Sequence, residues 1–554
     1  MIASLLPLCL LFSSVASPQG QAPITEILPL QHFVSSHPAS SVPAWGTLLQ
    51  RPTEQQQRDL LQATASDCSM ATEDMLNLLR ETAMAEIEAG RLHINALNEA
   101  LVVVGEATEV AKMRERVRLA GAVLARPLQI EFSVWDAADR ETPNAFLSAA
   151  DYAKFVGNRV PLARSVATAR HGAAVALERM RWSRYVRDLD AEVAQKQTMT
   201  QPTTDEYGEG SHAVVRAFGL LGSDEFAVHV QFASSQRRGV VRTVQTGLPG
   251  AAEIELPLLE TDCGACSGRI TNGGALAVTL RGHAASGGQR IVTLRVSSRT
   301  PPAQLVQEGL GIFPCGAITD AGLGSRVPLP GAAAMEERAT PGFGHMSSED
   351  LIQFVRDAFA AEASCGAGFM FVHGPSAVLA KAEAGLRELQ DRLVRNVTLA
   401  HTGTLAVVDN SGTGSAPSLH ELTLPTLLGR QLTMVRVLET NVIADLHPVI
   451  AQEAGILDPS VSMLQSGCWL SANVAPFEDS MHLQLRVQQL HAMPPPARSV
   501  MPGGGVLMAT EVARTAASHD GPLANGQATE HGDGPAITID GRGYRSALAT
   551  ILRW

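Results

Sequence analysis

Cys263 and Cys266 form a C-x-x-C motif, the spacing in this chain that most directly suggests chemistry. Two thiols at this spacing can form a redox pair, one half of a zinc site or a tight disulfide. No second C-x-x-C and no H-x-x-x-H follows at ligand spacing. A later stretch that otherwise resembles this region reads Thr515-Ala516-Ala517-Ser518 and lacks both thiols. We therefore expect a structural or incidental role, with thiol-redox chemistry as the alternative.

Other catalytic signatures are absent from the sequence. It contains no G-x-x-x-x-G-K-[ST], no H-E-x-x-H and no G-x-S-x-G. Gly309-Leu310-Gly311 and Gly322-Leu323-Gly324 lack the third glycine of a dinucleotide-binding loop. Glu253 and Glu255 alternate as on the solvated face of a strand. We assign no catalytic, cofactor-binding or metal-ligating residue, and we expect the protein not to be an enzyme.

The chain contains an internal repeat. A segment from about residue 73 to 282 recurs from about residue 349 to 554. Because each change of offset falls in a polar or Gly/Pro-rich stretch, the changes indicate deletions in loops. The matched residues are Glu73-Asp74 with Glu349-Asp350; Gly105, Ala111, Lys112 and Arg118 with Gly374, Ala380, Lys381 and Arg387; Gly172, Asp188, Ala194, Gln195, Pro202 and Gly210 with Gly429, Asp445, Ala451, Gln452, Pro459 and Gly467; and Asn272-Gly273 with Asn525-Gly526.

Each copy begins with a pattern typical of a small α/β module. Residues 73–85 and 108–124 have helical spacing, and the second helix should bury Val110, Met113, Val117, Ala120 and Leu124. Residues 92–94, 100–104 and 128–134 read as strands. In the second copy, 349–361 and 377–394 are the expected helices, and 368–373 and 397–399 the expected strands.

The remainder of each copy is predicted to be β-structure. Apolar residues alternate with polar ones over 226–232, 254–258, 276–280, 292–296 and 481–487. Asn272-Gly273 is a strong hairpin signal before the third of these runs. Such alternation predicts half-buried strands, with one polar face in water. Asp188/Asp445 and Gln195/Gln452 are expected to serve turns and hydrogen bonds.

Composition and the first residues suggest a folded, exported chain. The sequence has 554 residues, 45% hydrophobic and 18% charged, with a net charge of −12 that argues against nucleic acid as the main partner. The apolar run from Ile2 to Val15 ends in small residues, as signal peptides do, and is too short to span a bilayer. Cleavage is expected near Ala16. Cys68, Cys315, Cys365 and Cys468 show no pairing pattern in the sequence.

These observations divide the chain as follows: 1–16 signal peptide, 17–55 linker, 56–135 first α/β module, 136–300 first β-rich domain, 301–345 Pro/Gly linker, 346–400 second α/β module and 401–554 second β-rich domain.

The first module resembles the ring-building modules of bacterial secretins, the channel subunits of type II and type III secretion and of type IV pili. The resemblance is carried by the strand Ala100–Gly105, the basic and apolar helix Val110–Arg118 and the strand Pro127–Glu131. Asn272-Gly273-Gly274, together with a strand pair around a glycine over 210–232, fits the secretin core. The family usually has one core per chain, whereas this chain has two.

The resemblance implies an α+β fold, with ring-building-type α/β modules each followed by a β-rich, secretin-core-like domain, present twice in tandem. It also implies an exported structural or assembly component of a bacterial cell envelope, in the periplasm or outer membrane, associating with itself or with other secretion components and possessing no cofactor. The alternatives are a periplasmic binding or adhesion module and an exported thiol-redox enzyme.

Overall fold

The protein is described here by a computed structural model, in which the chain forms two compact units. The first comprises residues 1–35 and 70–122, and the second comprises 36–69 and 123–554. The expected signal peptide and Cys68 lie outside the described residues. The described residues are 23–29, 76–77, 79–80, 83–97, 100–124, 126–137, 143–194, 197–245, 253–281, 289–299, 305–307, 309–320, 346–366, 368–408, 418–451, 454–477, 480–492, 497–500, 506–509, 512–530, 537–539 and 542–554.

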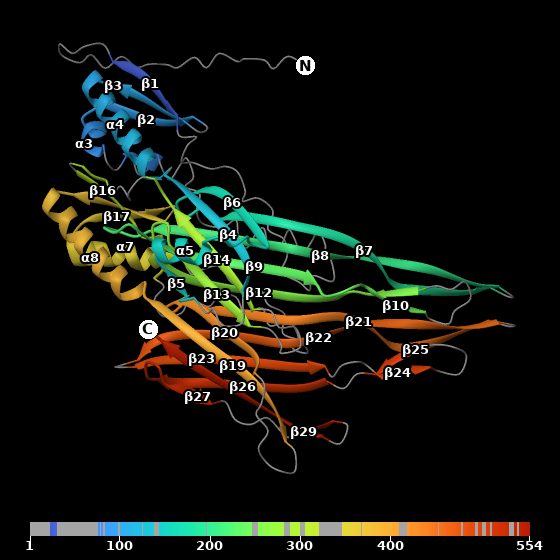
Figure 1. Ribbon diagram of the computed structural model, residues 1–554. Coiled ribbons are helices and arrows are strands. Elements are labelled where there is room, and N and C mark those ends of the chain that lie inside the picture. Colours follow the sequence, from blue (N-terminus) through green and yellow to red (C-terminus); the bar gives the residue numbers. More distant parts are fainter. Residues whose placement is uncertain are drawn as a thin grey trace, which may run out of the picture. The chain divides into compact units, whose positions relative to one another are not determined.

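The first unit is a small sheet with helices, drawn in blue in Figure 1. Its strands have the order β1-β3-β2. Strand β3, which the sequence predicts over 100–104, alternates between half-buried and buried residues. All five residues expected on the buried face of the second helix are buried. The elements are β1 (Ile24–Pro29), α3 (Met84–Glu88), β2 (Leu92–Leu97), β3 (Ala100–Gly105) and α4 (Ala107–Leu124).

Two parts of this unit differ from the sequence prediction. Helix α3 lies at the end of the helix expected over 73–85, much of which is outside the described residues. Strand β1 lies within the segment 17–55 that the sequence assigned to a linker. Because β1 pairs with β3 along its whole length, from Ile24 opposite Gly105 to Pro29 opposite Ala100, it belongs to the folded module.

The second unit contains a second α/β module. Its four-stranded sheet has the order β15-β16-β18-β17, and its helices bury Leu351, Val355, Leu379 and Leu386. The expected linker 301–345 is wrong in its first part, because β15, β16 and α6 fold there and β16 pairs with β18. The elements are β15 (Leu305–Gln307), β16 (Gly309–Pro314), α6 (Gly316–Thr319), α7 (Ser348–Phe359), β17 (Glu362–Gly366), β18 (Phe369–Gly374) and α8 (Ser376–Leu393).

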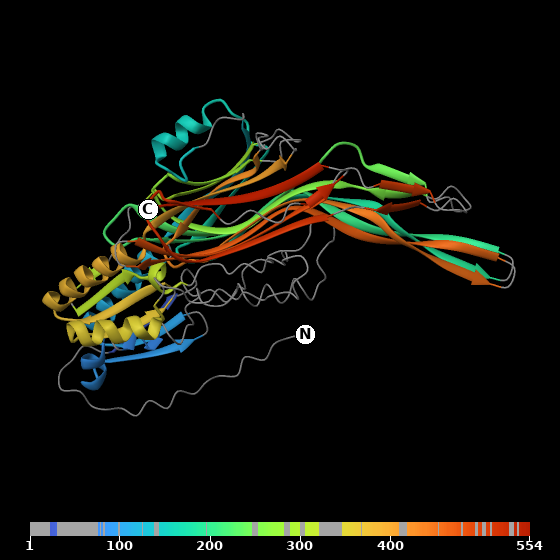
Figure 2. The same ribbon diagram turned by 90° about the horizontal axis from the view of Figure 1, so that it is seen from below.

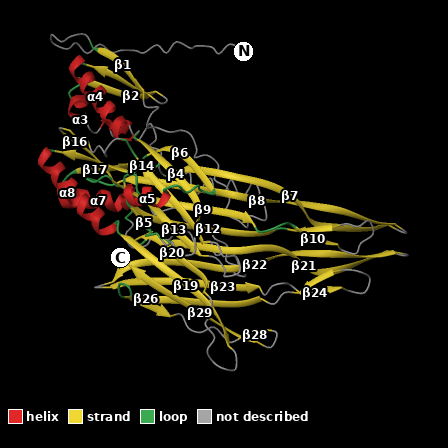
Figure 3. Ribbon diagram, in the orientation of Figure 1, coloured by secondary structure: helices red, strands yellow, loops and turns green. Residues whose placement is uncertain are grey.

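The remainder of the second unit is β-structure, in yellow in Figure 3, organised mainly as two large sheets. The eight-stranded sheet has the order β26-β23-β22-β21-β12-β9-β8-β7. Its strands are β7 (Val175–Ala194), β8 (Gln197–Gly219), β9 (Glu225–Arg237), β12 (Leu258–Thr271), β21 (Leu432–Ala451), β22 (Ala454–Phe477), β23 (Ser480–Ala492) and β26 (Val512–Leu523). In Figure 2 the hairpins β7–β8 and β21–β22 run side by side.

The ten-stranded sheet has the order β27-β29-β19-β20-β13-β14-β4-β6, with β28 on β29 and β5 on β13. Its strands are β4 (Pro127–Ala137), β5 (Phe146–Leu147), β6 (Ala163–Arg170), β13 (Ala275–Arg281), β14 (Gln289–Ser297), β19 (Asn396–Val408), β20 (Ser418–Leu427), β27 (Ala528–Glu530), β28 (Ile537–Ile539) and β29 (Arg542–Arg553). Outside the two sheets lie α5 (Ala149–Val156) and the hairpins β10 (Arg242–Gln245) with β11 (Glu253–Leu256) and β24 (Ala497–Val500) with β25 (Val506–Ala509).

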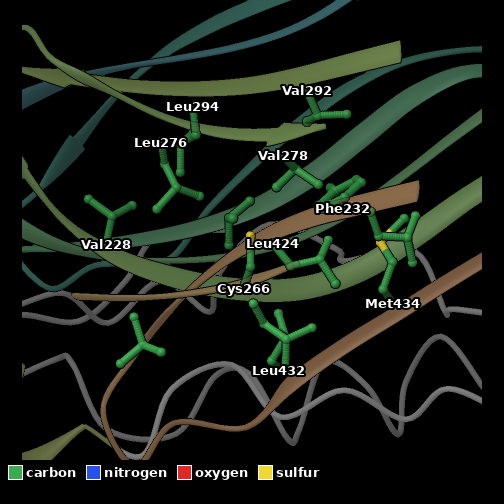
Figure 4. Packing of buried hydrophobic residues seen from close by; sticks show 14 of the residues in the cluster. Val228, Phe232, Cys266, Leu276, Val278, Val292, Leu294, Leu424, Leu432 and Met434 are labelled. Atoms are coloured by element: carbon green, nitrogen blue, oxygen red, sulfur yellow. The ribbon is translucent and has the colours of Figure 1, made fainter. Parts of the chain in front are cut away.

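One large core fills the space between these sheets. Figure 4 shows part of it, with Val228, Phe232 and Cys266 from the eight-stranded sheet against Leu276 and Val278 from the ten-stranded sheet. The same cluster contains residues from both halves of the chain, such as Leu294 and Leu424. The two halves therefore share a single core.

The prediction that each strand has one solvent-exposed face is wrong for β9, β13 and β14. These strands are buried on both faces over most of their length. In β9, the polar residues His229 and Gln231 are buried. The ring of His229 packs edge-on against Phe218, and Ala227 lies in a cluster with Ala317 and Ile318 of α6. The second module thus covers the face that the alternation assigned to water.

Candidate assembly interface

The two halves of the chain join edge to edge in the eight-stranded sheet. We call this junction the seam: strand β12 pairs antiparallel with β21, from Leu258 opposite Thr440 to Ala265 opposite Thr433. On one side of the seam lie β7, β8, β9 and β12, and on the other lie β21, β22, β23 and β26. The ten-stranded sheet is joined in the same way, by β13 and β20.

A buried network of charges crosses the seam. Glu260 and Asp262 of β12 are 5% and 0% exposed. Arg436 of β21 donates to Glu260 Oε1 at 2.8 Å and lies 3.3 Å from Asp262 Oδ1. Arg290 of β14 donates to Asp262 at 3.0 Å and to Glu260 at 3.1 Å, and Arg238 also binds Glu260. Three guanidinium groups thus enclose two carboxylates where the halves meet.

The electrostatics of this network favour an ionised Glu260. Burial alone would raise the pKa of its carboxyl group, because desolvation penalises the charged form. The guanidinium groups of Arg290, Arg436 and Arg238 outweigh that penalty and hold the pKa of Glu260 below its usual value. Such groups stabilise a fold only as a set, because removing one leaves its partners buried and unpaired.

Corresponding hairpins on the two sides of the seam have the same geometry. Met180 lies opposite Gly210 in β7–β8, and Val437 lies opposite Gly467 in β21–β22. The register shifts between 186 and 188 in the first hairpin and between 443 and 445 in the second. Asp188 and Asp445, two of the repeated residues, follow these shifts directly.

The glycines of these hairpins allow a close approach of two backbones. Gly210 and Gly467 have φ of +132° and +155°. A Cβ would lie 2.1 Å from the carbonyl oxygen of Arg179 in the first case and 2.0 Å from that of Arg436 in the second. Any side chain would collide with backbone there, so both positions require glycine.

The eight-stranded sheet ends in two different strands, and each of them corresponds to one of the two strands that meet at the seam. At one end is β26, which pairs with β23 as β12 pairs with β9. At the other is β7, which pairs with β8 as β21 pairs with β22. Within the described part of the chain, neither β26 nor β7 pairs with a further strand at its outer edge. An unpaired edge offers backbone N–H and C=O groups to another strand.

The C-x-x-C motif lies in β12, and its two thiols point into different clusters. Cys266 is buried in the core between the sheets, and Cys263 packs with Val435, Val437 and Trp469. Burial raises the pKa of both thiols. Reactive cysteines have the opposite character, with lowered pKa values and access to solvent.

Other residues singled out from the sequence occupy scattered places. Asp188 Oδ1 accepts from the backbone N–H of Leu189, consistent with a local hydrogen-bond role. Glu255 accepts from the N–H of Val186 at 2.7 Å. Gly309-Leu310-Gly311 lies within β16, not at a strand-to-helix turn. The side chains of Gln195 and Gln452, and the stretch Gly322-Leu323-Gly324, lie outside the described residues.

Sequence reasoning missed two groupings. The Sγ atoms of Cys315 and Cys365 lie 3.4 Å apart in the second module. His401, His420 and Cys468 form a buried cluster whose ligand atoms all lie within 4.8 Å of one another, a spacing that suits a metal ion. These residues are far apart in sequence, and only the repeat offsets, which align the histidines with Phe132 and Ala163, mark them as unusual.

No protein-family model and no curated protein matches the chain. Among solved structures, the InvG secretin domain β-barrel of the Salmonella SPI-1 injectisome is similar at 10% identity with a TM-score of 0.23, over 51% of this chain and 90% of that one. Aeromonas hydrophila ExeD is similar at 9% identity and a TM-score of 0.20, over 96% of this chain and 90% of that one.

The type II secretin GspD of enteropathogenic Escherichia coli is a further similar structure, at 8% identity and a TM-score of 0.19, over 38% of this chain and 84% of that one. TM-scores of this size do not establish a shared fold. Among the described residues, no helix is long and apolar enough to cross a bilayer.

Proposed function

We propose that the chain is a structural component of a bacterial cell envelope, related to the secretion-channel subunits, and that it contains two copies of one assembly unit. Each copy comprises an α/β module and a β-rich domain. The supporting observation is that paired hairpins in the two halves have the same register, the same position of the register shift and a glycine at the same place. The α/β modules agree too, since β1 pairs with β3 as β16 pairs with β18.

The proposed activity is self-association through the ends of the eight-stranded sheet, without catalysis. The seam joins two different edges, that of β12 and that of β21. The two outer edges correspond to these two strands. Strand β26 is the counterpart of β12 in the second half of the chain, and β7 is the counterpart of β21 in the first half. A second chain can therefore add its β7 to β26 by repeating the contact that already joins the two halves. Contacts between unlike surfaces generate rings or open filaments.

The internal seam also predicts the register between chains. Ala265 lies opposite Thr433 at the seam. In β26 the residue equivalent to Ala265 is Ser518, and in β7 the residue equivalent to Thr433 is Ala176. The pairings of these strands with β23 and β8 define this equivalence. Ser518 of one chain should therefore lie opposite Ala176 of the next. Thr515 should similarly lie opposite Arg179.

Disulfide trapping tests this register. Opposed residues of antiparallel strands have Cα atoms about 4.5 to 5.5 Å apart, within the range a disulfide spans. We expect the double variant Ser518→Cys/Ala176→Cys to form a ladder of cross-linked chains on a non-reducing gel after mild oxidation. Thr515→Cys/Arg179→Cys should do the same and samples the other kind of antiparallel pair, so the two variants test the register in both geometries.

The matched control places one thiol out of register. In Ser518→Cys/Arg179→Cys the two positions are offset by three residues, about 10 Å along the strand. This variant and the single-cysteine variants should give no ladder. Equal cross-linking in the control, or a chain that remains monomeric in detergent by light scattering, would refute the proposed assembly. A binding or adhesion module would give the monomeric result.

Export is a separate part of the proposal. The apolar run Ile2–Val15 motivates cleavage after Ala16. N-terminal sequencing of the mature protein from the envelope fraction should begin close to Ser17. Recovery of a chain that retains Met1 in the cytoplasm would contradict the periplasmic or outer-membrane location and leave the strand-edge assembly to be judged by cross-linking alone.

A further inference from the structure

A buried polar cluster lies between the two sheets in the second half of the chain. His401 is on β19 and His420 on β20, adjacent strands of the ten-stranded sheet. Cys468 is on β22 of the eight-stranded sheet. The three residues are 0%, 5% and 1% exposed. Their ligand atoms lie within 4.8 Å of one another, so the cluster bridges the two layers.

Neighbouring polar groups orient the two imidazoles. The rings are stacked, with centroids 5.3 Å apart and planes 28° from parallel. His401 Nδ1 lies 2.9 Å from the hydroxyl oxygen of Thr550, which can accept its N–H, and His420 Nδ1 lies 3.5 Å from the amide nitrogen of Gln489, which is a donor. A metal-bound histidine typically donates its other ring N–H to an acceptor, which fixes the ring and its tautomer. When Nδ1 of His401 donates to Thr550, Nε2 is the nitrogen that would bind an ion. At His420 the same tautomer requires the Gln489 amide to turn by about 180°, so that its oxygen accepts from Nδ1–H.

The backbone makes room for the second ring. Gly403 lies directly opposite His420 in the β19–β20 pair. A Cβ at position 403 would lie 2.1 Å from Cε1 and 2.7 Å from Nε2 of His420. Any residue other than glycine would therefore displace the imidazole from the cluster.

The corresponding pair of strands in the first half has no such cluster. There β4 pairs with β6 so that Val134 lies opposite Ala163, where β19 and β20 have Gly403 opposite His420. Phe132 takes the place of His401 and packs in the apolar core near Phe232. The same sheet arrangement thus folds with apolar residues, and the strand pairing itself does not require the histidines.

We propose that His401 Nε2, His420 Nε2 and Cys468 Sγ bind a divalent transition metal ion of the zinc class. Imidazole and thiolate together suit zinc, and three protein ligands leave a fourth position for water. On binding, the Cys468 thiol loses its proton to solvent as the metal–sulfur bond forms, with no change of oxidation state. The ion would tie the ten-stranded sheet to the eight-stranded sheet.

The three ligand atoms need to move only slightly closer together to bind a zinc ion. Zinc–nitrogen bonds of about 2.0 Å and zinc–sulfur bonds of about 2.3 Å place tetrahedral ligand atoms roughly 3.3 to 3.7 Å apart. The spacing of 4.8 Å or less is larger than this by about an ångström, which side-chain rotation can supply. This inference is independent of whether chains assemble through their strand edges.

Metal content of the full chain is the direct test. The protein is stripped with a chelator, incubated with zinc chloride, desalted and analysed by mass spectrometry for metals. We expect one zinc ion per chain. Substitution with cobalt(II) should give the ligand-field bands of a tetrahedral site together with a sulfur-to-cobalt charge-transfer band, which reports the thiolate specifically.

The variants replace ligands by the residues found in the first half. Cys468→Ser should lose the charge-transfer band and bind zinc at least tenfold more weakly, and so should His420→Ala. Cys266→Ser, which removes a buried thiol of the same core outside the cluster, should keep one zinc ion and the band. The triple variant His401→Phe/His420→Ala/Gly403→Val restores the apolar pattern of β4 and β6, and should fold without metal even if a single variant does not.

Thermal unfolding adds a second readout. A chelator should lower the melting temperature of the wild-type chain and of Cys266→Ser, but not that of the triple variant. A wild-type chain that takes up no stoichiometric zinc would overturn the proposal. So would a Cys468→Ser variant that retains the wild-type zinc affinity and cobalt spectrum, or a triple variant as sensitive to the chelator as the wild type.

Discussion

Replacing Glu260 by glutamine should test the charge network at the seam most sharply. The side chains are nearly the same size, so the change removes a charge without creating a cavity. Glu260 binds Arg238, Arg290 and Arg436, and the last two are buried with it. A glutamine has one acceptor oxygen, and its NH₂ group would face a guanidinium that also only donates.

The expected cost follows from these contacts. The wild-type network has three guanidinium groups and two carboxylates, whereas Glu260→Gln leaves Asp262 as the sole carboxylate among them. Removing one partner of a buried ion pair typically costs about 3 to 5 kcal/mol. Arg238 is partly exposed and can turn to water, so we expect about 3 kcal/mol for the loss at Arg290 and Arg436.

The control is an exposed pair of the same type. Glu388 and Arg392 form an ion pair on the surface of α8, with both side chains more than 60% exposed. Exposed pairs contribute about 0.2 to 1 kcal/mol. Glu388→Gln should therefore change the free energy of unfolding by less than about 1 kcal/mol. Urea denaturation followed by tryptophan fluorescence suits both variants, because Trp469 is buried near Val435 and Val437 of β21.

The pH dependence of the free energy of unfolding provides a second test of the charge network. The pKa of Glu260 is lowered in the folded protein, so its stabilisation is fully present above the unfolded-state pKa, about 4.3, and is lost as the pH falls below it. The stability gap between wild type and Glu260→Gln should therefore be constant from pH 7 to 5 and narrow at lower pH. A gap below about 1 kcal/mol at pH 7, or one that persists undiminished in acid, would refute this account of the seam.

Three further predictions concern backbone, histidine and thiols. Gly467→Ala should destabilise the chain by about 1 to 3 kcal/mol, because its Cβ would meet a carbonyl oxygen, whereas Gly521→Ala makes only ordinary contacts; chemical denaturation compares them. Burial lowers the pKa of His212 to about 4, so stability should fall as the pH drops from 6.5 toward 4, and His212→Gln should flatten that part of a melting-temperature profile. Cys263→Ser/Cys266→Ser should alter stability modestly and leave assembly unchanged in the cross-linking assay, and the native thiols should resist alkylation until the chain unfolds.

Local structure was largely predictable from sequence. The helix over 107–124 follows from apolar residues at helical spacing, the strands at 225–237 and 275–281 from apolar residues that alternate with polar ones, and the strand at 100–105 from a short apolar run that ends in glycine. The burial of the second face of β9 was not predictable in this way. Periodicity reports contrast between faces, and His229 is polar yet buried on the face where Phe218 and helix α6 lie.

The site was less predictable, for a related reason. Strand β1 was assigned to a linker because its segment is rich in proline, serine and glutamine, and β16 because its segment holds Pro-Pro and Pro-Gly pairs. The edges that these strands complete lie far away in sequence. The seam depends on which edges meet, and alternation within a strand carries no information about its neighbours. Glu260 and Asp262 read as two acids in an ordinary strand, and only the fold brings Arg436 and Arg290 to them.

The covalent connection between β12 and β21 has a consequence for concentration dependence. Two edges within one chain meet at an effective concentration in roughly the millimolar range, independent of how dilute the protein is. A contact between β26 and β7 of separate chains has no such advantage and obeys mass action. Dilution should therefore release intact chains that each keep the joined eight-stranded sheet, so the smallest stable species always contains an even number of β-domains.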